Sequence, residues 1–275
     1  MINADEIFGC DKAMIGMVHV PALPGTPNHD QPLGAIVKHC VNEARQLAEA
    51  GFDAVLIENM HDVPYLRGTV GPEITAAMTL IGHAVRRVVE CPLGVQILAG
   101  ANQQALAVAY TIGAEFIRTE GFVFATVADE GLMMEADAGP LLRYRKAIGA
   151  ESVRILADVK KKHCSHAITG DLDVGEFAKA AEFFGADGVI VTGLATGQAI
   201  RIDDLGCVRV ATRLPLLVGS GVTPDSVPDL FAYADALIVG SWLKHDGEWR
   251  NPIDPERARQ LVHAANGVRA TAQQP

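Results

Sequence analysis

Ionisable side chains recur at the ends of apolar segments of this sequence. His19 ends one such run, Arg118 ends another, and Asp158 begins a basic stretch that reads DVKKKH. Residues of these types can exchange protons near neutral pH when their neighbours adjust their pKa. Because a buried charge needs a partner, their position within a strand favours a functional site over a solvated loop. The candidate catalytic residues are His19, Glu58, Asn59, Arg118, Glu120, Asp129, Asp158, Lys162 and His163.

The stretch from Asp158 to His163 offers two kinds of chemistry. A carboxylate beside cations can position a lysine or a histidine for proton transfer, and a desolvated lysine could instead form a Schiff base. Side chains two residues apart share a face of a strand, so Lys160 faces Asp158 only if the strand stays regular, and Lys162 with His163 is the other choice. A solvated KKKH turn with surface ion pairs is the structural alternative.

Two glycine-rich tripeptides, GSG and VGS, end the last two apolar runs. Glycine lets a backbone approach a ligand closely, and exposed N–H groups at such turns bind anions. We therefore expect a substrate phosphate here, with Lys244 or His245 as an additional cation, although two ordinary tight turns would give the same pattern. The residues expected to bind the phosphate are Gly219, Ser220, Gly221, Gly240 and Ser241.

The histidines and carboxylates fit no compact ligand motif such as HExxH. No metal ligands and no cofactor are therefore predicted, although a divalent metal stays open. Five cysteines without a CxxC pair argue against a disulfide framework or a structural zinc site.

Two loops stand out in the sequence. Pro21, Pro24 and Pro27 follow His19, and because proline restricts the backbone we expect this loop to hold the imidazole and to wall one side of a pocket. Residues 122–139 exceed the usual loop length and predict a hairpin or lid over the site. The apolar cluster LMM at 132–134 could equally make an oligomer contact, and we expect a homo-oligomer.

Eight apolar runs of strand length must position these residues. They read AMIGMVHV, DAVLIENM, LGVQIL, EFIRTEG, VRILADVK, GVIVTG, PLLVGSGV and ALIVGSWL, starting at residues 13, 53, 93, 115, 153, 188, 215 and 236. They are continuous rather than alternating, as in parallel strands covered on both faces. The segments between them have helical periodicity, as in residues 32–51, and several end on a small residue and an acidic one before the next strand.

Eight such units predict an α/β fold, a single (β/α)8 TIM barrel, over residues 1–275 with a frayed tail at 270–275. An open doubly wound sheet is the alternative, but no GxGxxG follows the first strand. In the barrel the catalytic face is formed by the carboxyl ends of the strands, where the candidate residues gather.

The composition of the chain disfavours nucleic acid and membrane insertion. The net charge of −10 disfavours nucleic acid, since its field repels phosphate backbones. No run of 18 apolar residues and no signal peptide appear, so we expect a cytoplasmic protein without membrane insertion, although peripheral docking stays open.

Five motifs together resemble the BtpA family, which includes SgcQ-like proteins: IGMVHVPALPGTP, IENMHDVPY, ADEG with LLRYRKAIGA, ADVKKKH and LIVGSWLK. The resemblance covers essentially the whole chain. It implies a (β/α)8 fold and, from the family's name, a role in photosystem I biogenesis. It also implies functional importance for Asp158, Lys162 and His163, and less securely for Glu130, where the family has glutamine.

Three functions follow from these observations. The first is an enzyme of lyase, aldolase or isomerase type that acts on a phosphorylated sugar or nucleoside-like small molecule. The second is an assembly factor for a membrane complex, without catalysis. The third is a metal-dependent hydrolase, which rests on the carboxylates and histidines alone.

Overall fold

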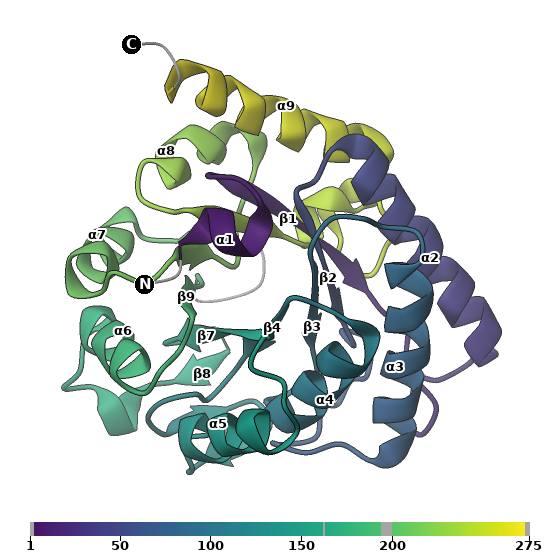
Figure 1. The fold of residues 1–275 in the computed structure, drawn as a ribbon, viewed down its shortest axis with the longest axis horizontal. Coiled ribbons are helices and arrows are strands. Elements are labelled where there is room, and N and C mark those ends of the chain that lie inside the picture. Colours follow the sequence, from purple (N-terminus) through teal and green to yellow (C-terminus); the bar gives the residue numbers. More distant parts are fainter. Residues whose placement is uncertain (1–2, 162, 194–199, 273–275) are drawn as a thin grey trace.

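Eight parallel strands close into a barrel in the computed structural model, which describes residues 3–161, 163–193 and 200–272 (Figure 1). Around the ring the order is β1-β11-β10-β9-β7-β4-β3-β2. Each expected strand is present, and the single-barrel prediction is confirmed. The strands are β1 (Ala13–His19), β2 (Ala54–Glu58), β3 (Leu93–Gln96), β4 (Phe116–Thr119), β7 (Arg154–Val159), β9 (Gly188–Val191), β10 (Leu216–Val218) and β11 (Ala236–Val239).

Helices surround the barrel and connect its strands (Figure 1). They are α2 (Leu33–Ala50), α3 (Pro72–Arg86), α4 (Asn102–Ile112), α5 (Ala138–Ala147), α6 (Val174–Phe183), α7 (Ile202–Ala211), α8 (Val227–Phe231) and α9 (Pro255–Ala272). The helix expected in residues 32–51 is α2, and Gly51 ends it with a φ of 94°, a value that favours glycine. Helix α9 continues through Ala272, so the tail expected to fray from residue 270 is still helical there.

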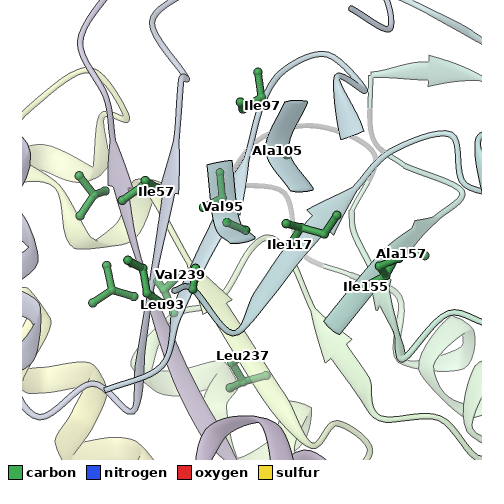
Figure 2. Close-up of a cluster of buried hydrophobic side chains, with 14 of the residues drawn as sticks. Ile57, Leu93, Val95, Ile97, Ala105, Ile117, Ile155, Ala157, Leu237 and Val239 are labelled. Carbon is green, nitrogen blue, oxygen red and sulfur yellow. The ribbon is translucent and has the colours of Figure 1, made fainter. Parts of the chain in front are cut away.

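The hydrophobic core has two parts. The larger part lies between the barrel and the helices, and Figure 2 shows some of its side chains, including Ile57, Val95 and Ile117. The smaller part fills the barrel interior, where α1 (Ala4–Phe8) closes the end formed by the strand amino termini and Phe8 packs edge-on against Phe116. Burial on both faces explains why the strands read as continuous apolar runs.

Four acidic residues fasten neighbouring strands together at the amino-terminal end of the barrel. Each precedes the second strand of a pair, accepts a hydrogen bond from the backbone N–H near the start of the first strand, and pairs with an arginine. Asp53 accepts from the N–H of Met14 and pairs with Arg269, and Glu115 accepts from the N–H of Leu93 and pairs with Arg86. Asp187 accepts from the N–H of Ile155 and pairs with Arg145, and Asp235 accepts from the N–H of Leu216 and pairs with Arg209. The acidic residue noticed before several strands is therefore a structural fastener.

The hairpin expected in residues 122–139 is present. Strands β5 (Thr126–Ala128) and β6 (Gly131–Met133) pair antiparallel, and β8 (Cys164–Ser165) joins the other edge of β5. Leu132 and Met134 are 40% and 71% exposed. The described chain also contains four 3-10 helices, η1 (Ala167–Thr169), η2 (Pro224–Ser226), η3 (Ser241–Leu243) and η4 (His245–Gly247). None of the described helices has both the length and the hydropathy that crossing a bilayer requires.

Candidate functional site

The pleat of the strands brings polar residues to the carboxyl-terminal mouth of the barrel. His19, Glu58 and Gln96 end three neighbouring strands and are partners in register, His19 with Glu58 and Glu58 with Gln96. Alternate residues of a strand share a face, and Met17 and Leu56, two residues before His19 and Glu58, point into the barrel. His19, Glu58 and their neighbour in register therefore point inward as well. The same parity brings Arg118 to the mouth from β4 and Gly240 from beyond β11.

A cavity of about 360 Å³ occupies this mouth. Eleven of the fourteen residues expected at the site line it, while Asn59 and Asp158 do not and Lys162 lies outside the described residues. The eleven are His19, Glu58, Arg118, Glu120, Asp129, His163, Gly219, Ser220, Gly221, Gly240 and Ser241. Residues far apart in sequence therefore meet in one cavity of a size that suits a small metabolite.

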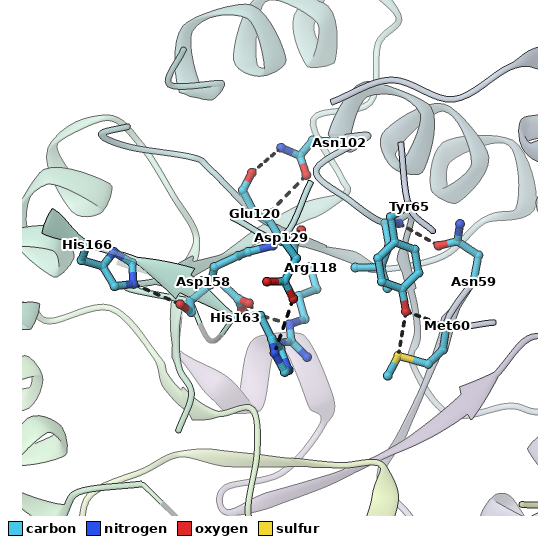
Figure 3. A network of polar contacts seen from close by, with 12 residues as sticks. Asn59, Met60, Tyr65, Asn102, Arg118, Glu120, Asp129, Asp158, His163 and His166 are labelled. Atoms are coloured by element: carbon cyan, nitrogen blue, oxygen red, sulfur yellow. Dashed lines mark hydrogen bonds and ion pairs between the residues drawn. The ribbon is translucent and has the colours of Figure 1, made fainter. Parts of the chain in front are cut away.

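Asp158 serves Arg118 rather than a lysine. Its two carboxylate oxygens each accept a hydrogen bond of 2.9 Å from Nε and Nη2 of Arg118, and both residues are buried (Figure 3). Burial lowers the pKa of the Arg118 guanidinium, but the Asp158 carboxylate outweighs that effect and leaves the pKa above its usual value. The expected pairing of Asp158 with Lys160 is therefore wrong, and the alternative pairing with Lys162 and His163 involves a residue outside the described ranges. Asp158 fixes the guanidinium that lines the cavity.

Among the described lysines, Lys161 is the one that lines the cavity. Its ammonium Nζ lies 3.0 Å from Oε2 of Glu120, and both side chains are about nine-tenths buried. Lys160 turns away, donates to the carbonyl of Leu172 and lies over the ring of Phe177. The pleat ends here because Lys160 adopts a φ of 47°, so the rule that residues two apart share a face does not extend beyond β7.

Lys161 is held as a cation. Burial alone lowers the pKa of its ammonium, but the Glu120 carboxylate, with smaller contributions from Cys164 and Glu130, raises the pKa above its ordinary value. An ammonium with a raised pKa is a poor nucleophile, because a Schiff base forms from the neutral amine. Lys161 is thus suited to stabilising negative charge.

His19 is positioned by the chain near the carboxyl terminus. Its Nδ1 lies 3.0 Å from the carbonyl oxygen of Trp249, and the two rings meet edge to face. The proline loop does not wall the cavity, because no residue of 20–32 is among its lining residues. That loop is held by the segment after β2 instead, where the N–H of Leu23 donates to the carboxylate of Asp62. The expectation that the proline loop walls one side of the cavity is wrong.

Asn59 is a structural residue of the loops behind the cavity. Its Oδ1 accepts a hydrogen bond of 2.7 Å from the N–H of Leu98, and its Nδ2 donates to Asp62 at 2.8 Å. Both interactions are buried. Asn59 therefore orders the segments that follow β2 and β3 without facing the cavity.

His163 and Asp129 meet where the hairpin approaches the mouth. Nδ1 of His163 lies 3.8 Å from Oδ2 of Asp129, and the two side chains are 42% and 79% exposed (Figure 3). Asp129 and its neighbour Glu130 are in the turn between β5 and β6, and both line the cavity. The hairpin thus adds carboxylates to the mouth.

The glycine turns after β10 and β11 form the wall opposite β3. Within the described chain, the backbone N–H groups of Ser220, Gly221 and Gly240 donate to no protein atom. A Cβ added at Gly219 would lie 3.3 Å from Nη2 of Arg118, so this turn runs against the guanidinium. The turns therefore present free donors beside a cation.

Neither Lys244 nor His245 adds a cation to this wall. Lys244 is buried and its Nζ lies 2.8 Å from the Glu43 carboxylate, while His245 lies 3.4 Å from Asp254. Neither residue lines the cavity. The expectation of a cationic contact from this pair is wrong, because Lys244 is used to join α2 to the segment before α9.

The sequence interpretation missed several lining residues. Gln96 was not assigned to the site, although its register with Glu58 and His19 marks it. Lys161 could not be chosen among three lysines without the local backbone. Tyr65 and Trp249 come from loops and Trp242 from the short 3-10 helix η3, where no periodicity identifies them. In the described ranges, no group of three histidine, cysteine or acidic side chains is arranged to hold a metal ion.

Relatives of the chain were found by sequence. A profile of the BtpA family matches residues 10–267. The chain is similar to an uncharacterized mitochondrial protein of Caenorhabditis elegans, with 45% identity over 93% of this chain and 94% of that protein. It is also similar to the photosystem I biogenesis protein BtpA of Synechocystis, with 34% identity over 96% of this chain and 92% of that protein.

Solved structures share the fold. Thiamine phosphate pyrophosphorylase from Pyrococcus furiosus matches with a TM-score of 0.58 and 14% identity, over 94% of this chain and 96% of that one. A 3-hexulose-6-phosphate synthase matches with a TM-score of 0.58 and 16% identity, over 92% and 99%. At these identities the likeness is one of fold, whereas the profile and the sequence relatives show that this chain belongs to the BtpA family.

Proposed function

We propose that this protein is an enzyme of lyase, aldolase or isomerase type that acts on a phosphorylated sugar or nucleoside-like compound in the barrel mouth. The observation that carries the proposal is one cavity with free backbone donors on one wall and a buried acid and ammonium pair, Glu120 and Lys161, in its lining. A phosphate anchor and a proton-transfer group are the parts that these reactions require.

The turns after β10 and β11 support the phosphate anchor. Free N–H groups at Ser220, Gly221 and Gly240 match the acceptor oxygens of a phosphate, and the guanidinium of Arg118 lies beside the first turn. Barrels of this type commonly bind substrate phosphates after the seventh and eighth strands, which here are β10 and β11.

The remaining lining residues support carbonyl chemistry. Isomerisation needs a base that removes a proton from carbon and an acid that returns it, and retro-aldol cleavage needs a base for a hydroxyl proton. Both reactions develop negative charge on a carbonyl oxygen, which a nearby ammonium stabilises. Glu58 and Glu120 are the candidate bases, and Lys161 is the candidate for charge stabilisation.

Thermal unfolding with phosphorylated compounds tests the anchor. A ligand at a hundred times its dissociation constant stabilises the protein by about 2.7 kcal/mol, so inorganic phosphate and sugar phosphates should raise the unfolding temperature. The absence of any shift with every phosphate compound would remove the proposal.

A matched pair of variants at Ser241 locates the anchor. Ser241→Asp places a negative charge at the turn, and like charges about 4 Å apart repel by about 4 kcal/mol near a protein surface, so phosphate should bind at least about tenfold more weakly. Ser241→Asn introduces a side chain of the same size as aspartate without the charge, and should bind phosphate more tightly than Ser241→Asp does. Equal binding by the two variants would place the phosphate elsewhere.

A second candidate function is assembly of a membrane complex without catalysis. It is supported by the name of the Synechocystis relative and by exposed Leu132 and Met134 on the hairpin, which a partner could cover. Leu132→Ser with Met134→Ser should then abolish partner binding in a pull-down and leave phosphate affinity unchanged. Elemental analysis of protein purified without chelator tests separately whether a divalent metal is bound.

A further inference from the structure

Gln96 is a buried polar residue whose side-chain oxygen has no hydrogen-bond partner among the described residues. Its side chain is 1% exposed and lines the cavity, and its amide makes no hydrogen bond with any described residue, Oε1 included. A buried amide without partners is unfavourable, and such groups in native proteins usually meet a ligand or a water molecule. Gln96 thus presents one acceptor and two donors to whatever fills the mouth.

Gln96 lies across the barrel from the glycine turns that are proposed to bind the phosphate. In the ring of eight strands, β3 lies four places from β10, directly across the barrel. A ligand whose phosphate rests on the turn at Gly219 and Gly221 therefore directs its other end toward Gln96. The cavity volume of about 360 Å³ suits a compound of a few carbons spanning this width.

The charges around Gln96 restrict what that end can be. Four carboxylates line the cavity, Glu58, Glu120, Asp129 and Glu130, while Lys161 is paired with Glu120. The guanidinium of Arg118 is already held by the buried carboxylate of Asp158. A second anionic group on the ligand would meet repulsion here, whereas neutral hydroxyl groups would find acceptors.

We propose that Gln96 determines substrate choice by binding the neutral, hydroxyl-bearing end of a phosphorylated polyol across the barrel from its phosphate. Compounds that carry a carboxylate in place of the hydroxyls are rejected. This inference rests on the proposed function, because it needs the phosphate to bind at the glycine turns. It adds the class of substrate and the residue that reads it.

Isothermal titration of three kinds of probe tests the assignment. The probes are inorganic phosphate, a panel of sugar phosphates that includes ribose 5-phosphate and fructose 6-phosphate, and the carboxylates 3-phosphoglycerate and phosphoglycolate. The best sugar phosphate should bind at least about tenfold more tightly than inorganic phosphate, since each hydrogen bond gained adds roughly that factor. The two carboxylates should bind no more tightly than inorganic phosphate.

Gln96→Met keeps the length of the side chain and removes its amide. It should weaken the best sugar phosphate by at least about tenfold and leave inorganic phosphate unchanged, because only the hydroxyl-bearing end loses its partner. Gln104→Leu is the matched control, since Oε1 of Gln104 is also buried without a partner but Gln104 does not line the cavity. That variant should change neither affinity. Gln96→Ala serves if the methionine variant does not fold.

The outcomes separate the inference from the proposed function. If phosphate binds but sugar phosphates and carboxylates bind alike, or if Gln96→Met leaves the best sugar phosphate unchanged, Gln96 does not select the substrate and the proposed function stands. Equal weakening of phosphate and sugar phosphate by Gln96→Met assigns the residue a structural role and also overturns the inference. If no phosphate compound binds the wild type, both proposals fail.

Discussion

At the scale of single residues, the mouth of the barrel divides into groups that face the cavity and groups that hold them. Asp158 and Asn59 are buried behind the lining, where Asp158 fixes Arg118 and Asn59 orders two loops. Replacing one member of a buried ion pair leaves the other charge without compensation, so a variant of Asp158 would confuse stability with function. Substitutions that report on the site must therefore come from the cavity lining.

His19→Ala is the sharpest test of the lining. The substitution removes the hydrogen bond to the Trp249 carbonyl at a place that opens into the cavity, and the free energy of unfolding should fall by about 1–2 kcal/mol. The affinity for the best sugar phosphate should fall at least about tenfold, because an imidazole beside the phosphate wall is lost. Chemical denaturation and calorimetry measure the two effects.

The matched control for His19 is His83→Ala. His83 is exposed on α3, and its removal should change neither stability nor affinity. If His19→Ala unfolds the protein instead, His19 is a core residue and its role at the site is lost.

A second prediction at this scale concerns pH. Burial, with smaller contributions from the cations Lys244, His39 and Arg250, lowers the pKa of His61 from 6.5 to about 4. The unfolded chain then binds more protons than the fold between those values, so the contribution of His61 to stability is present above pH 6.5 and is lost as pH falls toward 4. For a partly buried ring the loss amounts to about 1–2 kcal/mol.

Comparing His61→Gln with the wild type isolates this effect. The free energy of unfolding should fall between pH 7 and pH 4.5 by about 1–2 kcal/mol less in the variant than in the wild type, as measured by denaturation at the two pH values. Nδ1 of His29 donates to the Ala22 carbonyl and His29 lies outside the cavity, so His29→Gln is a suitable comparison. If the free energy of unfolding depends on pH in the same way for the wild type and for His61→Gln, the lowered pKa of His61 is contradicted.

At the scale of elements, sequence and structure agree best where burial sets the pattern. The eight strands follow from continuous apolar runs, and α2 follows from its stripe of apolar residues, because each element must bury the same faces in any barrel. The hairpin at β5 and β6 was recognisable by length alone. These features are readable in the sequence because burial determines the residue types along the whole length of an element.

The site was less predictable because it depends on a few torsion angles. The sequence left a choice between Lys160 and Lys162, whereas Lys161 lines the cavity because Lys160 has a φ of 47°, which no periodicity reveals. Trp249 reaches the mouth from a loop and holds His19, a task that the sequence interpretation assigned to the prolines. Parity along strands could have selected Gln96, since Glu58 was already a candidate residue and the two are partners in register.

The acidic fasteners allow a prediction at this scale. Asp187 accepts the N–H of Ile155 and pairs with Arg145, both at 2.8 Å, at the end of the barrel away from the cavity. Asp187→Ala leaves a partly buried donor without its acceptor and should lower the free energy of unfolding by about 1–3 kcal/mol. Phosphate affinity should not change. Denaturant titration and calorimetry measure these two quantities.

The control for Asp187 is an acidic residue without such a role. Asp171 is exposed in the turn before α6, and Asp171→Ala should alter stability by less than about 0.5 kcal/mol. A loss of phosphate affinity in Asp187→Ala would mean that the two ends of the barrel are coupled.

At the scale of the whole molecule, the two ends of the barrel have different tasks. The amino-terminal end is closed by α1 and by the four acidic fasteners, which tie strands into pairs. The carboxyl-terminal end holds the cavity, and the small sheet of β5, β6 and β8 lies at its rim with Asp129 and Glu130 in the lining. The fastening ion pairs and the cavity thus lie at opposite ends of the barrel, the ends that in this fold usually serve stability and activity, respectively.

This division predicts where a ligand changes the motion of the chain. The rim sheet has only three short strands and exposed apolar side chains, so its amides should exchange with solvent through local openings of low free energy. A phosphorylated compound in the cavity contacts the turn between β5 and β6 and should slow exchange in residues 126–133, while amides near Met14 and Ile155 at the other end keep their rates. Hydrogen exchange followed by mass spectrometry, with Ser241→Asp as the control that binds weakly, measures both regions. Equal protection at both ends would indicate global stabilisation instead, and no protection of the hairpin would show that it does not close over the ligand.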